Sequence, residues 1–126
     1  EACRVGMRTV ALAGGQLQVN GVPIEMRGVN RHEHDDRRGK YTDRASMVKD
    51  ITLLKQLNFN AVRASHYPNR NLWYDLCNVY GLWIVDEANV ETHGVVAFKP
   101  EDVLASDPSW EHSFLDRMTR MVLRDR

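Results

Sequence analysis

Strand-like runs alternate with segments of helical periodicity along this chain, and that order constrains the fold more than any other feature. Residues 24–29, 59–63 and 82–85 are short runs that are typical of strands. Apolar residues at helical spacing follow at residues 44–57 and 71–80, and again after residue 107. Strands that alternate with helices in this way imply a parallel sheet with right-handed crossovers. We therefore predict an α/β fold.

The residues before the first of these strands are predicted to form antiparallel β structure. Residues 5–10 are strand-like, Gly14 and Gly15 mark a turn, and the Asn20-Gly21 pair after residues 17–19 is a hairpin signal. A hairpin followed by three βα units fits part of a (β/α)₈ barrel or part of an open doubly wound sheet. No Gly-x-Gly-x-x-Gly or Walker-type motif occurs, which disfavours a nucleotide-binding sheet. A closed barrel needs about 250 residues, so we expect these 126 residues to be one part of it.

Capping residues mark the ends of the predicted helices. Thr42 or Asp43 can cap the start of the first helix, and Asn58 can end it. Gly81 suits the C′ position of the second helix, and Asp107-Pro108 opens the last one. The apolar face of the last helix would consist of Trp110, Phe114, Leu115, Met118, Met121 and Val122. Core packing is the role expected for the aromatic residues Trp73, Tyr74, Trp83 and Trp110.

Composition excludes several classes of function. Seventeen basic residues balance seventeen acidic ones, so no net field would recruit nucleic acid or an anionic membrane. No apolar run approaches the roughly 18 residues of a membrane span, and the N-terminus lacks the profile of a signal peptide. Cys3 and Cys77 give neither a disulfide framework nor a zinc spacing. We therefore expect a cytoplasmic protein with no nucleic-acid or membrane partner.

The apolar run at residues 82–85 ends abruptly in polar and charged side chains. Asp86, Glu87, Asn89, Glu91 and His93 follow it within eight residues. Because desolvating an unpaired carboxylate is costly, these groups need partners or a ligand. Metal and substrate sites of α/β proteins lie at the carboxyl ends of strands. The segment therefore indicates an enzyme.

Each of the three predicted parallel strands is followed by a polar cluster. Residues 30–34 follow the first strand, Arg63 and residues 65–67 follow the second, and residues 86–93 follow the third. In a βα barrel these strand ends lie on one face, so we expect the clusters to converge on one pocket. Three such clusters in succession are a stronger signal than any one of them.

Glu91 and His93 are two residues apart, so they can point to the same side of an extended segment. A carboxylate and an imidazole placed in this way can share one cation. Imidazole suits Zn²⁺ or Mn²⁺, whereas carboxylates and waters suit Mg²⁺ or Mn²⁺. Spacing alone therefore leaves the metal open, and a surface ion pair would explain the same pattern.

His66 lies where the chain itself fixes its direction. The strand before it sets its orientation, and Pro68 stiffens the loop after it. Arg63, at the end of the same strand, is costly to bury alone and needs a carboxylate such as Glu87. A purely structural salt bridge would explain Arg63 and Glu87 equally well.

These motifs resemble one known family. The Gly-Val-Asn-x-His-Glu stretch within residues 27–34, the Ser-His-Tyr-Pro stretch within residues 59–69, and residues 85–94 resemble the bacterial-type β-galactosidases of glycoside hydrolase family 2. The resemblance extends over residues 19–126. Shorter versions of the first two motifs also occur in the β-glucuronidases of that family. Residues 87–94 resemble the galactosidases specifically, so this segment favours a galactosidase over a glucuronidase.

The resemblance implies a fold and a division into domains. The family has a (β/α)₈ TIM barrel as its catalytic domain, preceded by β-sandwich domains. Residues 1–14 would then be the end of the preceding β-sandwich domain. Residues 15–126 would be the N-terminal part of the barrel, with its first three βα units.

The resemblance also implies roles for individual residues. Glu91 and His93 would be ligands of an active-site Mg²⁺, with Mn²⁺ as an alternative and Na⁺ as a further cation of the full enzyme. His32 and His66 would contact galactose hydroxyls and stabilise the transition state. Arg63 would support the substrate pocket.

The expected function follows, together with its alternatives. A retaining glycosidase needs two carboxyl groups about 5–5.5 Å apart, and by resemblance both catalytic glutamates would lie beyond Arg126. We expect part of a retaining β-galactosidase that acts on terminal β-D-galactose residues, as in lactose. The whole enzyme would be a homo-oligomer, and this chain alone would be inactive. The alternatives are a β-glucuronidase-like enzyme of the same family and a non-catalytic sugar-binding or assembly fragment.

Overall fold

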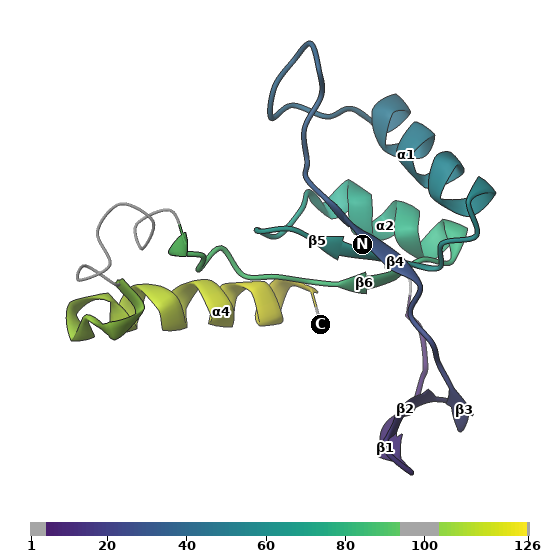
Figure 1. The fold of residues 1–126 in the computed structure, drawn as a ribbon, viewed down its shortest axis with the longest axis horizontal. Coiled ribbons are helices and arrows are strands. Elements are labelled where there is room, and N and C mark those ends of the chain that lie inside the picture. Colours follow the sequence, from purple (N-terminus) through teal and green to yellow (C-terminus); the bar gives the residue numbers. More distant parts are fainter. Residues whose placement is uncertain (1–4, 94–103, 126) are drawn as a thin grey trace.

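The computed structural model describes residues 5–93 and 104–125, which form two small sheets with flanking helices (Figure 1). The antiparallel sheet contains β1 (Val10–Ala13), β2 (Gln16–Val19) and β3 (Val22–Pro23). The parallel sheet contains β4 (Gly28–Arg31), β5 (Ala61–Ala64) and β6 (Trp83–Val85). The helices are α1 (Arg44–Gln56), α2 (Asn71–Tyr80) and α4 (Glu111–Asp125), and 3₁₀ turns occupy Leu104–Ser106 and Pro108–Trp110.

The parallel sheet has the order β4-β5-β6, so strands that follow one another in sequence are also neighbours in space. Gly28 pairs with Ala61, which in turn pairs with Trp83. The two connecting helices, α1 and α2, contact each other and lie on one side of this sheet (Figure 1). The predicted α/β class and the parallel pairing of these strands are confirmed.

Two of the predicted strands lie elsewhere than expected. The sequence predicted a strand at residues 5–10, but β1 begins at Val10, which pairs with Val19. Thr9 is bound by Asn20 in the turn that follows β2, and residues 5–8 pair with no strand in the described part of the chain. The strand predicted at residues 24–29 is displaced to β4, because Asn60 binds the backbone before it. The Asn60 side chain accepts from the Arg27 backbone N–H at 2.7 Å and donates to the Glu25 carbonyl at 2.8 Å.

The predicted turns and the predicted caps of α1 and α2 are confirmed, whereas Asp107-Pro108 opens the 3₁₀ turn Pro108–Trp110 and α4 begins only at Glu111. Asp43 rather than Thr42 caps α1, because its carboxylate accepts from the Ser46 backbone N–H at 2.9 Å. Asn58 follows the end of α1 with φ of 60°, and Gly81 ends α2 with φ of 70°, both in the left-handed region. The predicted turns at residues 14–15 and 20–21 join β1 to β2 and β2 to β3.

The hydrophobic core lies between α1, α2 and the parallel sheet. Its buried members are Met47, Ile51, Leu54, Val62, Trp73, Leu76, Cys77 and Leu82. Trp73 is 0% exposed, which confirms the core role predicted for it. Burial also raises the pKa of the Cys77 thiol to about 12, so this cysteine stays protonated.

The face predicted for the last helix packs less than expected. No residue of α4 is buried, and Leu115, Met118 and Val122 are each at least 45% exposed. The described part of the chain has no element that covers this face, which explains the difference. Within residues 5–93 and 104–125, no helix is both long and apolar enough to cross a membrane.

Gly28 allows β4 and β5 to approach closely, and Gly28→Ala is expected to lower the free energy of unfolding by about 1–3 kcal/mol. A Cβ at this position would lie 2.7 Å from the Ala61 carbonyl oxygen, and this backbone atom cannot move without separating the strands. Thermal unfolding of the variant measures the loss. Gly6→Ala is the matched control, because a Cβ there meets nothing within 4 Å. Equal melting temperatures for the two variants would refute the close approach.

Candidate active site

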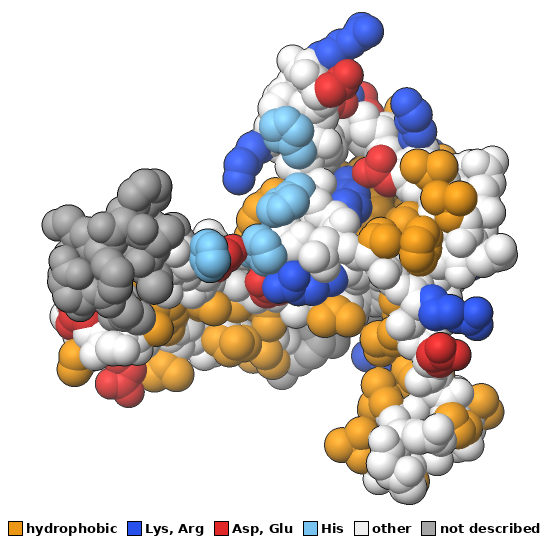
Figure 2. Space-filling model, in the orientation of Figure 1, with side chains coloured by type: hydrophobic (Ala, Val, Ile, Leu, Met, Phe, Trp, Pro, Cys, Tyr) orange, Lys and Arg blue, Asp and Glu red, His pale blue; other side chains and the backbone are white. Residues whose placement is uncertain are grey.

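The carboxyl ends of β4, β5 and β6 meet at one edge of the parallel sheet. Because Arg31 pairs with Ala64, and Arg63 with Val85, the residues that follow these strands emerge side by side. The predicted clusters therefore share one edge of the sheet, and the common pocket predicted for them stays a prediction. Figure 2 shows histidines on this part of the surface, with acidic and basic side chains between them.

Glu87 binds both Arg63 and His66. Its carboxylate lies 2.6 Å from Arg63 Nη2 and 2.9 Å from His66 Nδ1. The predicted pairing of Arg63 with Glu87 is therefore present, and the same carboxylate also orients the imidazole. Arg63 and His66 are each about one third exposed, so the group lies at the surface rather than in the core.

His32 lies beside His66, from the neighbouring strand. Their ring centroids are 5.4 Å apart, with the rings nearly perpendicular. The ring centroid of Tyr67 lies 5.9 Å from that of His32, and the Tyr67 hydroxyl accepts a hydrogen bond from the Glu33 backbone N–H. Sequence reasoning missed this role of Tyr67, although an aromatic residue directly after a candidate histidine was the available signal.

Glu91 faces the same histidine from the loop after β6. Its carboxylate lies 3.6 Å from His66 Nε2, on the side of the ring opposite Glu87. His93 is exposed, and within the described residues no three His, Cys, Asp or Glu side chains are grouped as metal ligands. Glu91 and His93 supply an oxygen and a nitrogen donor, a set that Mg²⁺ or Mn²⁺ accepts when waters complete the shell. Their role as metal ligands stays a prediction.

A second polar cluster, which the sequence did not reveal, lies where β6 meets α4. Tyr74 donates to Asp86 at 2.8 Å, while Asn69 N–H and Arg124 Nη2 donate to the Tyr74 oxygen at 2.9 and 3.1 Å. Burial and the neighbouring Asp125 carboxyl raise the pKa of Asp86. Burial and the bond to Asp86 also raise the pKa of Tyr74 above its usual range.

Asp86→Asn is expected to stabilise the protein more at pH 8 than at a pH below 3.8, the ordinary pKa of aspartate. A raised pKa in the folded state favours protonated Asp86, so the wild type loses this stabilisation as the pH rises through the folded-state pKa. Asparagine cannot ionise, and it keeps an oxygen to accept from Tyr74. Melting temperatures of both proteins across this pH range measure the effect. A difference that is largest below pH 3.8 would show that Asp86 is stabilised as the carboxylate.

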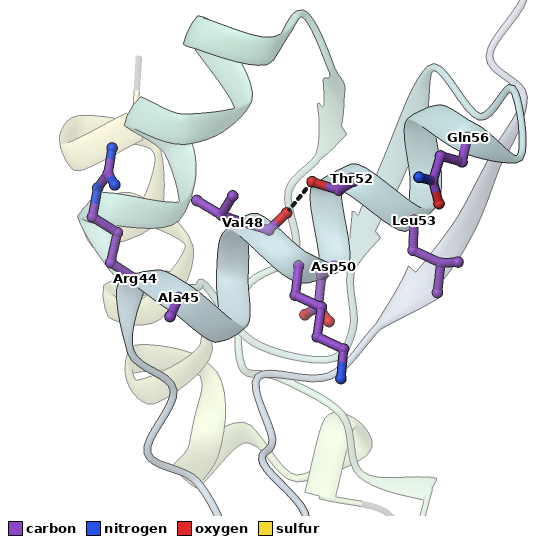
Figure 3. Close-up of a pocket in the computed structure, with 8 residues that line it drawn as sticks. Arg44, Ala45, Val48, Asp50, Thr52, Leu53 and Gln56 are labelled. Atoms are coloured by element: carbon purple, nitrogen blue, oxygen red, sulfur yellow. Dashed lines mark hydrogen bonds between the residues drawn. The ribbon is translucent and has the colours of Figure 1, made fainter.

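A surface hollow on α1 is separate from these clusters. It is lined by Arg44, Ala45, Val48, Lys49, Asp50, Thr52, Leu53 and Gln56, all from one helix (Figure 3). Thr52 donates to the Val48 carbonyl at 2.8 Å within this helix, so its hydroxyl is already engaged. None of the residues that surround His66 lines the hollow. The candidate site lies at the strand ends instead.

Comparison with known families identifies the family of this fold. The model of the TIM barrel domain of the glycosyl hydrolases family 2 matches residues 10–126. The chain therefore belongs to glycosyl hydrolase family 2, a family of glycosidases.

Several individual relatives of this chain are β-galactosidases. The chain is 57% identical to a β-galactosidase of Erwinia tasmaniensis, 56% to one of Enterobacter cloacae and 52% to one of Photobacterium profundum. Each match covers the whole of this chain but only 12% of the relative. The chain thus corresponds to a small part of each of these enzymes.

Solved structures of the same family share the fold. The β-glucuronidase of Bifidobacterium dentium, complexed with coumarin-3-O-glucuronide, is 40% identical, with a TM-score of 0.63 over 65% of this chain and 13% of that one. The β-glucuronidase of Dictyoglomus thermophilum is 37% identical, with a TM-score of 0.63 over 66% of this chain and 14% of that one.

Proposed function

We propose that this chain supplies part of the sugar-binding face of a retaining β-galactosidase, with β4, β5 and β6 as the first three strands of its (β/α)₈ barrel. The observation that carries the proposal is the convergence of His32, His66, Arg63 and Glu87 at one edge of the parallel sheet. Identity of 52–57% to β-galactosidases over the whole chain supports the substrate class. The domain boundary between residues 14 and 15, the homo-oligomeric state of the whole enzyme and its cytoplasmic location remain predictions.

His66 is suited to bind a sugar hydroxyl through its Nε2 atom. Its Nδ1 lies 2.9 Å from Glu87 and 3.2 Å from Arg63, and it cannot donate to the first and accept from the second. The shorter, charge-assisted contact to the carboxylate favours the Nδ1–H tautomer. With Nδ1 donating to Glu87, Nε2 is left to bind a sugar hydroxyl on the side of Glu91, whose carboxylate lies 3.6 Å away. Arg63 acts by holding Glu87 in place.

His32 and His66 would stabilise the transition state together. Their rings lie close enough to contact neighbouring hydroxyls of one pyranose ring. As the sugar gains oxocarbenium character, its hydroxyls become better hydrogen-bond donors, so contacts to imidazole strengthen in the transition state. Such contacts raise kcat rather than only lowering KM.

Glu91 and His93 would hold the Mg²⁺ that the family resemblance implies, with Mn²⁺ as the alternative. The ion would supply positive charge near the sugar oxygens. Because Glu91 also faces His66 at 3.6 Å, this carboxylate would connect the metal ligands to the histidine pair. Removing the metal is therefore expected to weaken sugar binding and turnover together.

The two catalytic glutamates would come from other parts of the whole protein. Glu87 is engaged by Arg63 at 2.6 Å and by His66 at 2.9 Å, and such pairing disfavours a role as general acid. Glu91 is assigned to the metal. We therefore expect the 126-residue chain on its own to hydrolyse no galactoside.

The second candidate function is that of a β-glucuronidase, which the solved relatives favour. A glucuronide carries a carboxylate that a free cation at the site would recognise. The guanidinium of Arg63 is already paired with Glu87, so it offers little unpaired charge to such a group. This pairing and the identity to galactosidases favour the neutral sugar.

Turnover of p-nitrophenyl β-galactoside and β-glucuronide by the whole protein tests the proposal. We expect galactoside turnover that exceeds glucuronide turnover by at least about a thousand-fold, because a missing carboxylate partner penalises the charged sugar. EDTA is expected to reduce turnover and Mg²⁺ to restore it, and the 126-residue chain serves as the inactive control. The reverse preference would establish the glucuronidase. Galactose binding without turnover of either substrate would establish a non-catalytic module.

A further inference from the structure

The end of β4 carries a buried arginine that none of the roles above uses. The Arg31 side chain is only 7% exposed. Its Nε donates to Asp50 on α1 at 2.9 Å, and its Nη1 donates to Asn69 at 3.2 Å. The guanidinium also stacks on the ring of Trp73 in α2, 3.7 Å from the ring centroid. Arg31 thus joins three elements behind the strand-end cluster.

Arg31 holds the loop that carries His66 at both of its ends. At the start of the loop, the Arg31 carbonyl accepts from the Ser65 backbone N–H at 3.1 Å and from the Ser65 hydroxyl at 3.2 Å. At the other end, the guanidinium binds the Asn69 side chain, which also donates to the Tyr67 carbonyl within the loop. Ser65 and Asn69 are each at most 1% exposed, so both anchors are buried.

Arg31 also precedes His32 directly. Successive side chains of a strand point to opposite faces, so the inward direction of Arg31 fixes the outward direction of His32. Both histidines of the site therefore depend on the placement of this one residue.

Burying a guanidinium requires compensation, and the surroundings of Arg31 provide it for Nε and Nη1, whereas Nη2 is buried without a hydrogen-bond partner among the described residues. Asp50 lies at 2.9 Å and Glu33 at 3.9 Å, so two carboxylates oppose one charge. Packing alone would be met at lower cost by an apolar residue of similar volume. The buried charge gives instead a set of directional bonds to elements far apart in sequence.

We propose that Arg31 is a positioning residue that holds His32 and the His66 loop at the separation the sugar requires. The proposal rests on the proposed glycosidase function. Arg31 touches no substrate in this role, and it acts through the two histidines. A misplacement of about 1 Å at a reacting centre costs about a hundred-fold in rate, which sets the scale of the expected effect.

Arg31→Met and Asn69→Ala in the whole protein test the proposal. Methionine keeps the apolar volume and the bonds of the backbone carbonyl to Ser65, but it loses the guanidinium bonds to Asp50 and Asn69. The kcat/KM for p-nitrophenyl β-galactoside is therefore expected to fall about ten- to a hundred-fold, mostly in kcat. Asn69→Ala keeps the contacts of Arg31 with Asp50 and Trp73 and removes one anchor, so a smaller fall in kcat is expected. Arg31→Lys keeps the positive charge but lacks the planar guanidinium with its several N–H donors, so it should recover only part of the activity.

Inhibitor binding separates positioning from a merely structural role. A galactose-configured iminosugar that mimics the transition state should lose at least ten-fold more affinity than a thiogalactoside that mimics the ground state. Arg120→Met is the matched control, because that arginine is exposed and pairs only within α4. Equal losses for both inhibitors, or a fall explained by less folded protein, would overturn the positioning role. A wild type with no glycosidase activity would instead refute the proposed function and this inference with it.

Discussion

Replacing Glu87 by Gln is expected to lower kcat/KM for a β-galactoside by about a hundred-fold or more in the whole protein. The carboxylate of Glu87 holds His66 Nδ1 at 2.9 Å and Arg63 at 2.6 Å. Glutamine keeps the volume but removes the negative charge, so Arg63 loses its ion pair and the tautomer of His66 is no longer fixed. Displacement of a group that contacts the transition state costs rate on this scale.

Steady-state kinetics of Glu87→Gln and of a control variant measure the predicted loss of kcat/KM. Glu111→Gln is a matched control, because Glu111 is an exposed residue in the first turn of α4. Its kcat/KM should stay within about two-fold of the wild type, as surface substitutions usually change stability by less than about 0.5 kcal/mol. A Glu87→Gln variant that matches this control would reduce the Arg63–Glu87 pair to a purely structural salt bridge.

Replacing Trp73 by Ala is expected to lower the free energy of unfolding by about 3–5 kcal/mol. Trp73 is 0% exposed and belongs to the core between α1, α2 and the sheet. Its removal leaves a cavity and also takes away the aromatic face on which the Arg31 guanidinium stacks. Urea unfolding followed by circular dichroism measures the loss.

Two further variants make this result specific. Trp110→Ala removes an indole that is only partly buried, so its loss should be much smaller. Trp73→Phe should cost less than Trp73→Ala, because Trp73 Nε1 is buried without a hydrogen-bond partner among the described residues and phenylalanine removes this donor. Equal losses for Trp73→Ala and Trp110→Ala would contradict the assigned core.

The fold could be predicted from the sequence wherever a local pattern decides it. Asp43, Asn58 and Gly81 mark the ends of helices through their own side chains or backbone preferences, and they do so in the structure. Strand bounds depend instead on partners. Arg31 was assigned to a polar loop but lies inside β4, because Ala64 on β5 pairs with it.

The candidate site divides in the same way. The meeting of His32, His66 and Glu87 follows from the order of strands, since parallel strands carry their ends to one edge. Arg31 binds Asp50, 19 positions away in sequence, and Asn69, 38 positions away. No local sequence pattern predicts contacts between residues so far apart. Whether Glu91 and His93 bind Mg²⁺ stays a prediction.

The Tyr74 hydroxyl connects three parts of the molecule through its hydrogen bonds. Its oxygen gives its one proton to Asp86 and fills both lone pairs with donors from Asn69 and Arg124. This one oxygen atom therefore links the loop that carries His66, the acidic segment after β6, and α4. Exchange for phenylalanine, usually a mild change, would remove one hydrogen bond from each of the three at once.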